Sequence, residues 1–196
     1  MGKKLNWLIL LIILPVTLAI GCGEMGKVEQ GRVIGFDNTK ATVTLIRDVK
    51  ADTANPDYSG APITFALPTE PKDRGEDPKA GMRMKLDAKA KEITIYDPAT
   101  KGFKKIAYTL IDQKEKVAKD DPLVAGKKFP QVDKAKKAIT IYSGRQKLLT
   151  TFSVPDEYLD LPDNTWEAGD EVRIYFKEPG KALRFQNITK TDIFKK

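Results

Sequence analysis

Residues 36–46 read FDNTKATVTLI, and the pattern of this stretch determines the fold class of the chain. An apolar residue is followed by Asp37, whose carboxylate can accept hydrogen bonds from the amides of its own turn. A short polar bend comes next, and then apolar side chains alternate with threonine. Alternation with a period of two is typical of a β-strand that is buried on one face. The stretch therefore predicts a β-hairpin.

The same pattern returns twice along the chain. Residues 86–96 read LDAKAKEITIY and residues 132–142 read VDKAKKAITIY, starting 50 and then 46 residues further on. Alternation places Val43, Leu45, Ile93, Ile95, Ile139 and Ile141 inward, and Thr44, Thr94 and Thr140 outward. Two origins are compatible with the three copies: internal duplication, or similar hairpins that arose independently. Either origin gives the same strands.

Further strands are predicted at residues 63–67, 103–111, 147–154, 169–176 and 182–188. The segment 48–80 is rich in proline, glycine, aspartate and asparagine and predicts a long loop, which is either a binding loop or a mobile excursion. The last third of the chain thus contains five predicted strands, with a non-strand link between the third and the fourth. This order favours a small closed barrel.

The first 22 residues have the three parts of an export signal. Two lysines supply a positive start, residues 5–20 are mostly apolar, and the small Gly21 precedes Cys22. A membrane-spanning helix needs roughly 20 apolar residues, and Pro15 removes a helical hydrogen bond from this shorter run. A cleaved signal is therefore predicted. The alternatives are an ordinary signal peptide, or an N-terminal anchor helix, in which the cysteine is incidental.

The end of this segment, Leu18-Ala19-Ile20-Gly21-Cys22, resembles the lipobox of bacterial lipoproteins, with Ala19 where that pattern usually has leucine. The resemblance implies that the Cys22 thiol receives a diacylglyceryl group, that the signal is cut before Cys22, and that the new amino end is acylated, for example with palmitate. Such a multi-chain anchor holds a protein stably on a membrane. Gly23, which is not an aspartate, implies sorting to the outer membrane, facing the periplasm.

The C-terminal part resembles the small periplasmic OB-like barrels of bacteria. Gly169, Asp170, Val172 and Ile174 match their closing element, and the resemblance covers residues 126–190. A weaker resemblance to the same barrels spans residues 31–112, where Gly81-Met82-Arg83-Met84 takes the place of the closing element. As a whole, the chain also resembles uncharacterised bacterial lipoproteins of similar length.

These observations predict an all-β fold with two small OB-like or SH3-like antiparallel barrels in tandem, after a cleaved N-terminal signal helix. The charged segment 114–126, which includes Asp-Asp-Pro, is the best candidate boundary between them. The predicted division is a signal peptide at 1–21, a lipidated tether at 22–30, a first barrel at 31–112, a linker at 113–126, a second barrel at 127–190 and a tail at 191–196.

Composition excludes several classes of function. The chain has no histidine and one cysteine. It therefore lacks the commonest general base, the usual serine or cysteine triads and imidazole-based zinc or copper sites, and it cannot form an internal disulfide. Only seven of the 34 cationic residues are arginine. A lysine-rich surface predicts no nucleic-acid partner; its preferred interpretation is a solvated charged face, and the alternative is weak attraction to anionic lipid or glycan surfaces.

Candidate ligand residues are few. Copper-chaperone barrels bind Cu(I) through two thioethers, an imidazole and a tryptophan, so Met82 and Met84 are candidate metal ligands, although core packing is the preferred role. Carboxylates before Trp166 could bind Ca²⁺, and a solvated loop is the preferred reading for them and for a similar group in the long loop. These two groups are Asp156, Glu157, Asp160 and Asp163, and Asp48, Asp52, Asp57 and Tyr58. No cofactor is predicted.

Five aromatic residues could form a ligand face on a barrel sheet, although half-buried packing is preferred for most of them: Tyr96, Tyr142, Tyr158, Trp166 and Tyr175. The expected function is that of a non-enzymatic, lipid-anchored cell-envelope protein that binds or helps to assemble another envelope component, a protein or a glycan. The alternative is a periplasmic carrier of a metal or small ligand, in the manner of the copper chaperones.

Overall fold

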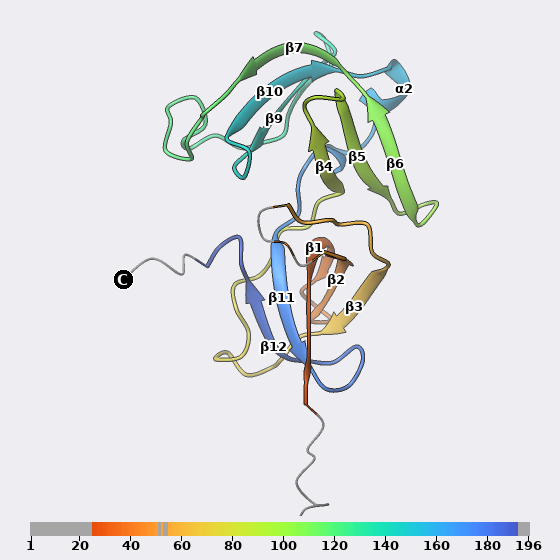
Figure 1. Ribbon diagram of the computed structural model, residues 1–196, viewed down its shortest axis with the longest axis vertical. Coiled ribbons are helices and arrows are strands. Elements are labelled where there is room, and N and C mark those ends of the chain that lie inside the picture. The colour runs from red at the N-terminus through yellow and green to blue at the C-terminus, as the bar shows by residue number, and fades with distance from the viewer. Residues whose placement is uncertain (1–24, 51, 53–54, 192–196) are drawn as a thin grey trace, which may run out of the picture.

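The computed structural model describes residues 25–50, 52 and 55–191 (Figure 1). The predicted signal peptide, the predicted lipidation site Cys22 and residues 192–196 of the predicted tail lie outside the described residues.

Strands make up most of the regular structure, which confirms the predicted all-β class. Their bounds are β1 Lys27–Asp37, β2 Thr42–Arg47, β3 Pro62–Ala66, β4 Arg83–Asp87, β5 Glu92–Asp97, β6 Gly102–Ala107, β7 Thr109–Lys114, β8 Gln131–Asp133, β9 Ala138–Ser143, β10 Leu148–Ser153, β11 Glu171–Phe176 and β12 Ala182–Asn187. Two short helical segments follow β10: α2 at Asp156–Leu159 and the 3-10 turn η1 at Asp163–Thr165. Among the described residues, no helix has the length and apolarity needed to cross a membrane.

The strands form three antiparallel sheets in two lobes (Figure 1). The five-stranded sheet, in the order β12-β11-β1-β2-β3, belongs to the discontinuous lobe, which is built from residues 25–80 and 168–191. The sheets β4-β5-β6 and β7-β10-β9-β8 belong to the inserted lobe, residues 82–166. In Figure 1 the inserted lobe lies above the discontinuous lobe.

This topology corrects the predicted domain limits. The hairpin β11-β12, expected to close the second barrel at 127–190, pairs with β1 at the other end of the chain. Strand β7, expected mostly within the first barrel at 31–112, pairs with β10. Within the described chain, none of the three sheets closes into a barrel. Local periodicity specifies that a segment is a strand but does not specify its partner, and this is why the limits were misplaced.

Two smaller corrections follow from the same pairing. The predicted linker at 113–126 lies inside the inserted lobe, between β7 and β8, and its first two residues belong to β7. The predicted tether at 22–30 is shorter than expected, because residues 27–30 are the start of β1 and pair with β11.

Each lobe has its own apolar core. In the discontinuous lobe, Val43 and Leu45 are fully buried together with Phe65 and Ile174. In the inserted lobe, the four remaining residues predicted to face inward pack around Trp166: Ile93, Ile95, Ile139 and Ile141. All six predicted inward positions are therefore confirmed. Burial of such a side chain contributes about 1.5–3 kcal/mol to folding.

A third, small cluster joins the lobes. It contains Ile34, Ile46 and Tyr58 from the discontinuous lobe, and Met84 and Tyr96 from the inserted lobe. On β2, Leu45 and Ile46 are neighbours in sequence and face opposite sides of the sheet, as strand geometry requires. One side chain thus fills the core of its lobe, and the next contacts the other lobe.

The three repeated turns have the same geometry. Asp37 Oδ1 accepts a hydrogen bond from the Lys40 amide at 3.0 Å, and the carboxylates of Asp87 and Asp133 accept the equivalent bonds at 2.9 and 3.0 Å. The residue before each returning strand has a left-handed backbone, with φ of 49° at Ala41, 53° at Lys91 and 50° at Lys137. The predicted turn hydrogen bonds are confirmed.

Two further hairpins of the inserted lobe share the left-handed position, at Lys101 and Lys147, each with φ of 52°. Asp97, at the start of the first of these turns, accepts a hydrogen bond from the Ala99 amide at 2.9 Å. The sequences around these two turns have proline or glycine after the first residue and do not align with the three repeated copies. A left-handed residue before the returning strand is therefore not limited to those copies.

Acidification tests the turn aspartates. Hydrogen bonds from turn amides hold the pKa of Asp37, Asp87, Asp97 and Asp133 below the ordinary value of 3.8. A carboxyl whose pKa is lower in the folded state stabilises the fold above its unfolded pKa and loses that contribution as the pH falls through the folded pKa. Carboxyl NMR titration should give four values below 3.8, and Asp97→Asn should reduce the acid dependence of the free energy of unfolding. Values at or above 3.8 would contradict the assignment.

Candidate functional site

The chain crosses between the lobes twice, and the two crossings lie side by side. Met82 and Ala168 form an isolated antiparallel bridge. The Arg83 amide donates to the carbonyl of Glu167 at 2.9 Å, and the Asp170 amide donates to the carbonyl of Lys79 at 2.8 Å. We call these two segments, residues 79–83 and 164–170, the junction. Backbone groups of each segment hydrogen-bond to backbone groups of the other. These bonds hold the lobes together where the chain passes between them.

Two glycines allow this close approach. A Cβ on Gly169 would overlap the carbonyl oxygen of Val33 in β1, and a Cβ on Gly81 would overlap the carbonyl oxygen of Glu167. The Gly81 amide also donates to the Val33 carbonyl at 3.1 Å. These are the glycines of the two sequence motifs that we expected to close separate barrels. They instead lie against each other and against β1.

Two β-bulges shape the surface beside the junction. The register of β1 shifts between Val33 and Gly35, and the register of β4 shifts between Arg83 and Lys85. A bulge adds a residue on one strand and re-aims the side chains around it. Arg83 and Met84 are consequently both buried although they are adjacent in a strand.

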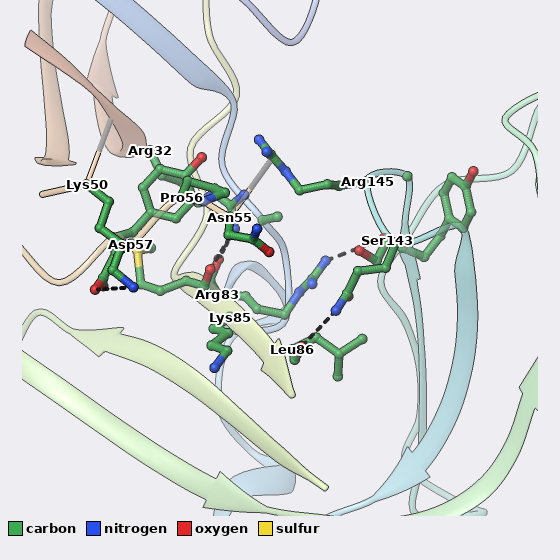
Figure 2. A pocket seen from close by; sticks show the side chains of 16 residues that line it. Arg32, Lys50, Asn55, Pro56, Asp57, Arg83, Lys85, Leu86, Ser143 and Arg145 are labelled. Atoms are coloured by element: carbon green, nitrogen blue, oxygen red, sulfur yellow. Dashed lines mark hydrogen bonds and ion pairs between the residues drawn. The ribbon is translucent and has the colours of Figure 1, made fainter. Parts of the chain in front are cut away.

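Two arginines meet at this surface (Figure 2). The Arg83 side chain is buried, and its Nε donates to the Trp166 carbonyl at 2.8 Å while its Nη2 donates to the Tyr142 carbonyl at 3.4 Å. Arg32 Nη1 donates to the carbonyls of Arg83 at 3.2 Å and Met84 at 2.8 Å. The Arg32 guanidinium also lies over the Tyr58 ring, 4.2 Å from its centroid.

Neither guanidinium forms an ion pair with a carboxylate of the described chain; both are held by backbone carbonyls. Arg32 as a whole is partly exposed, but its Nε is shielded from solvent and has no hydrogen-bond partner there. The Tyr58 hydroxyl is likewise buried without a partner of hydrogen-bonding geometry. A buried charge without a counter-charge costs several kcal/mol of folding free energy.

The pKa values reflect this environment. Burial lowers the pKa of Arg32, against the opposing influence of Tyr58 and Glu171. Burial, and then the charge of Arg32, lower the pKa of Arg83 to about 9. Both guanidiniums therefore remain charged at neutral pH. Burial raises the pKa of Tyr58 to about 12, so its hydroxyl keeps its proton and can donate a hydrogen bond.

A cleft of about 490 Å³ opens between the lobes at these side chains. Its described lining contains five cations and one carboxylate, namely Arg32, Lys50, Arg83, Lys85 and Arg145, and Asp57. Lys50 lies 3.9 Å from Asp57, and Lys85 lies 3.1 Å from Asp87. Arg145 pairs with Glu171. The charges of Arg32 and Arg83 are thus the ones that the cleft leaves without a carboxylate partner.

The Arg145–Glu171 ion pair joins the lobes across this region. Arg145 lies in the β9–β10 turn of the inserted lobe, and Glu171 begins β11 of the discontinuous lobe. Glu171 also accepts a hydrogen bond from Gln30 Nε2 at 2.6 Å. A second hollow of about 740 Å³ shares Arg32, Arg145 and Tyr142 with the cleft. The two hollows therefore meet at Arg32 and at this ion pair.

Comparison with known proteins gives one match. A family model described as a domain of unknown function, DUF4881, matches residues 24–196. The chain belongs to this family. No curated protein and no solved structure matches the chain. The family match covers both lobes and the junction, so the cleft lies wholly within the family domain.

The two methionines predicted as possible metal ligands both pack at the cluster that joins the lobes, with Met84 buried in it and Met82 partly buried against it. Met84 also lines the cleft, whereas Met82 lines a different hollow of about 510 Å³ beside α2. In the part of the chain that the structure describes, no group of three or more His, Cys, Asp or Glu side chains could hold a metal ion.

The structure places the two groups of acidic residues predicted as possible Ca²⁺ ligands in different settings. Asp156 pairs with Lys137 at 2.8 Å and Asp160 pairs with Lys134 at 3.1 Å, so these carboxylates point to separate lysines. In the long loop, Asp48 accepts hydrogen bonds from the amides of Lys50 and Asp57 and thereby shapes the loop. The same loop brings Asp57 and Tyr58 to the cleft. This part of the long loop is therefore a wall of the candidate site.

The five candidate aromatic residues do not form one face. Trp166 is fully buried in the inserted-lobe core, and Tyr96 is buried between the lobes. Tyr158 lines the hollow beside α2, and Tyr175 lies against Gly26. Tyr142 lines the cleft, and its hydroxyl donates to the Val117 carbonyl at 3.0 Å.

Sequence reasoning missed the arginines of the cleft. The chain has seven arginines among 34 cationic residues, and three of the seven, Arg32, Arg83 and Arg145, line this one cleft. The scarcity of arginine in a lysine-rich chain was the available signal. It could not be used without knowing that residues separated by 51 and 62 positions come together.

The junction glycines give a direct stability test. Gly169→Ala should lower the free energy of unfolding by about 1–3 kcal/mol, because the new methyl group must displace the β1 backbone. Gly102→Ala is the matched control, since its nearest neighbour would lie 3.7 Å from the added Cβ. Urea denaturation followed by circular dichroism measures both variants. Equal midpoints for the two variants would contradict the close packing of the junction.

Proposed function

We propose that this chain is a non-enzymatic, lipid-anchored protein of the cell envelope that binds another envelope component through the cleft between its lobes. The observation that carries the proposal is the cleft lining, which combines arginine, lysine and tyrosine side chains. Arginine and lysine stay protonated at neutral pH, and the pKa of Tyr58 is raised to about 12. Such groups bind and orient a partner but do not exchange protons with it under these conditions.

The position of β1 supports an anchored arrangement. Lys27 opens β1 at the end of the discontinuous lobe that is remote from the inserted lobe (Figure 1). Lys27 is the fifth residue after Cys22, and a chain of five residues spans at most about 18 Å. A lipid on Cys22 would therefore keep the discontinuous lobe near the membrane surface and present the cleft and the inserted lobe away from it. The proposed location is the outer membrane, facing the periplasm.

A second candidate function is a carrier of a small ligand. Its support is the size of the cleft, since pockets of about 300–1,000 Å³ commonly hold small molecules. The metal form of this alternative has less support, because Met82 and Met84 line different hollows. We therefore retain the carrier only for a small ligand that suits the cationic lining.

Fatty-acid labelling tests the anchor. Cys22→Ser should abolish incorporation of radioactive palmitate and leave the precursor uncut, because the hydroxyl cannot form the thioether. Gly23→Asp is the matched control: it should keep the label and move the protein from the outer to the inner membrane fraction. Undiminished labelling of Cys22→Ser would overturn the anchor.

Photo-crosslinking in intact cells tests the binding role. Lys85 is exposed and lines the cleft, so a benzophenone amino acid at this position should capture the bound component. The same probe at Lys181, in the turn before β12, should not, because that turn lies at the opposite end of the discontinuous lobe (Figure 1). Equal or absent capture from both positions would contradict a partner in the cleft.

A further inference from the structure

The two cleft arginines retain unused hydrogen-bond donors. A guanidinium has five N–H donors. Arg32 uses two of them, both on Nη1, and Arg83 uses one on Nε and one on Nη2. Three donors on each side chain are therefore left without a protein acceptor in the described part of the chain. The Tyr58 hydroxyl adds a further donor: no acceptor lies within hydrogen-bond geometry of it, although the Arg32 and Glu171 side chains are close enough to influence it.

The arrangement is costly unless something neutralises it. The charge of Arg32 lowers the pKa of Arg83, which means that the two guanidiniums repel each other. The carboxylates that influence them most, Glu171 for Arg32 and Glu167 for Arg83, are paired with Arg145 and Lys79 instead. Backbone carbonyls supply partial charges only. A bound anion would remove the repulsion and occupy the unused donors at once.

The two positive charges of the guanidiniums favour an anion with two negative charges. Two guanidiniums offer two positive charges and a set of N–H forks that match oxyanion geometry. A phosphoryl group carries nearly two negative charges at neutral pH and three terminal oxygens, whereas a carboxylate carries one charge and two oxygens. A phosphoryl group therefore balances the site more completely.

We infer that the cleft between the lobes binds a phosphoryl group of an envelope molecule, held by Arg32 and Arg83 with the Tyr58 hydroxyl as an additional donor. This inference rests on the proposed binding function and names the chemistry that the cleft recognises. Lys50, Lys85 and Arg145 line the same cleft and attract the anion towards it. Because the cleft of about 490 Å³ extends well beyond the two guanidiniums, the phosphoryl group is the terminal phosphomonoester of a larger molecule, either a phosphorylated saccharide or a lipid of the phosphatidic acid type.

Calorimetric titration of the purified protein with glucose 6-phosphate tests this inference. The protein should bind one phosphate ester, and Arg32→Lys should weaken the binding at least tenfold, because lysine keeps the charge and loses the fork. Arg184→Lys is the matched control, since Arg184 lies on β12 with an exposed side chain. Equal affinities of these two variants for a phosphate ester that the unchanged protein binds would overturn the inference.

Tyr58→Phe separates binding from folding. The variant removes a hydroxyl that has no partner in the described structure and keeps the ring under Arg32. We expect an unchanged or higher midpoint of unfolding together with at least threefold weaker binding of the phosphate ester. A loss of stability without any loss of binding would show that the hydroxyl serves the fold and not the ligand, and would remove it from the site.

A second arm distinguishes the two sources of the phosphoryl group. Vesicles that contain phosphatidic acid should sediment with the protein in an Arg32-dependent manner if the ligand is a lipid headgroup, and should leave it in solution if it is a saccharide phosphate. Failure of both probes would overturn the phosphoryl inference. It would leave the proposed binding function intact if the benzophenone at Lys85 still captured a partner, so the two failures are distinguishable.

Discussion

The structure depends on the close contact of two backbone segments at the junction. Gly81 and Gly169 bring the segments together so tightly that neither position can hold a Cβ without moving the backbone of its neighbour. The contact fixes where the inserted lobe leaves and re-enters the discontinuous lobe. It also determines the sheet order, because β11 can join β1 only if the chain returns beside its point of departure. The small cluster between the lobes and the cleft both contain residues of the two lobes that the junction holds together.

The junction also accounts for the charge of the cleft. The bulges in β1 and β4 lie beside it, and Arg32 and Arg83 are next to them in sequence. Each guanidinium is then fastened by carbonyls of the junction or of its neighbouring strands, such as Trp166 and Met84. A buried charge without a counter-charge costs several kcal/mol of folding free energy. This cost is the physical basis of the proposed anion site.

Much of the fold follows from local pattern. The alternation around Val43, Ile93 and Ile139 identifies strands and their buried faces, and the aspartate that begins each turn identifies the bend. These features depend on neighbours within about ten residues, so a single sequence contains them. The all-β class follows directly from their sum.

The candidate site could not be read in the same way. The pairing of β1 with β11 joins residues about 140 positions apart, such as Gln30 and Arg173. The alternation of apolar residues in either strand does not indicate which strand it pairs with. The bulges break the alternation at Ile34 and at Met84, where a strict period of two assigns the wrong face. Arg32 and Arg83 stand beside these interruptions. The residues proposed to bind the ligand are thus located where the local rule fails, which is where strain and function commonly coincide.

Anomalous diffraction from crystals soaked in tungstate would show whether the cleft binds an oxyanion, because tungstate is a tetrahedral dianion with a strong anomalous signal. We expect a peak in the cleft, with tungstate oxygens about 3 Å from the guanidinium nitrogens of both Arg32 and Arg83. Peaks confined to exposed lysines, with an empty cleft, would contradict it.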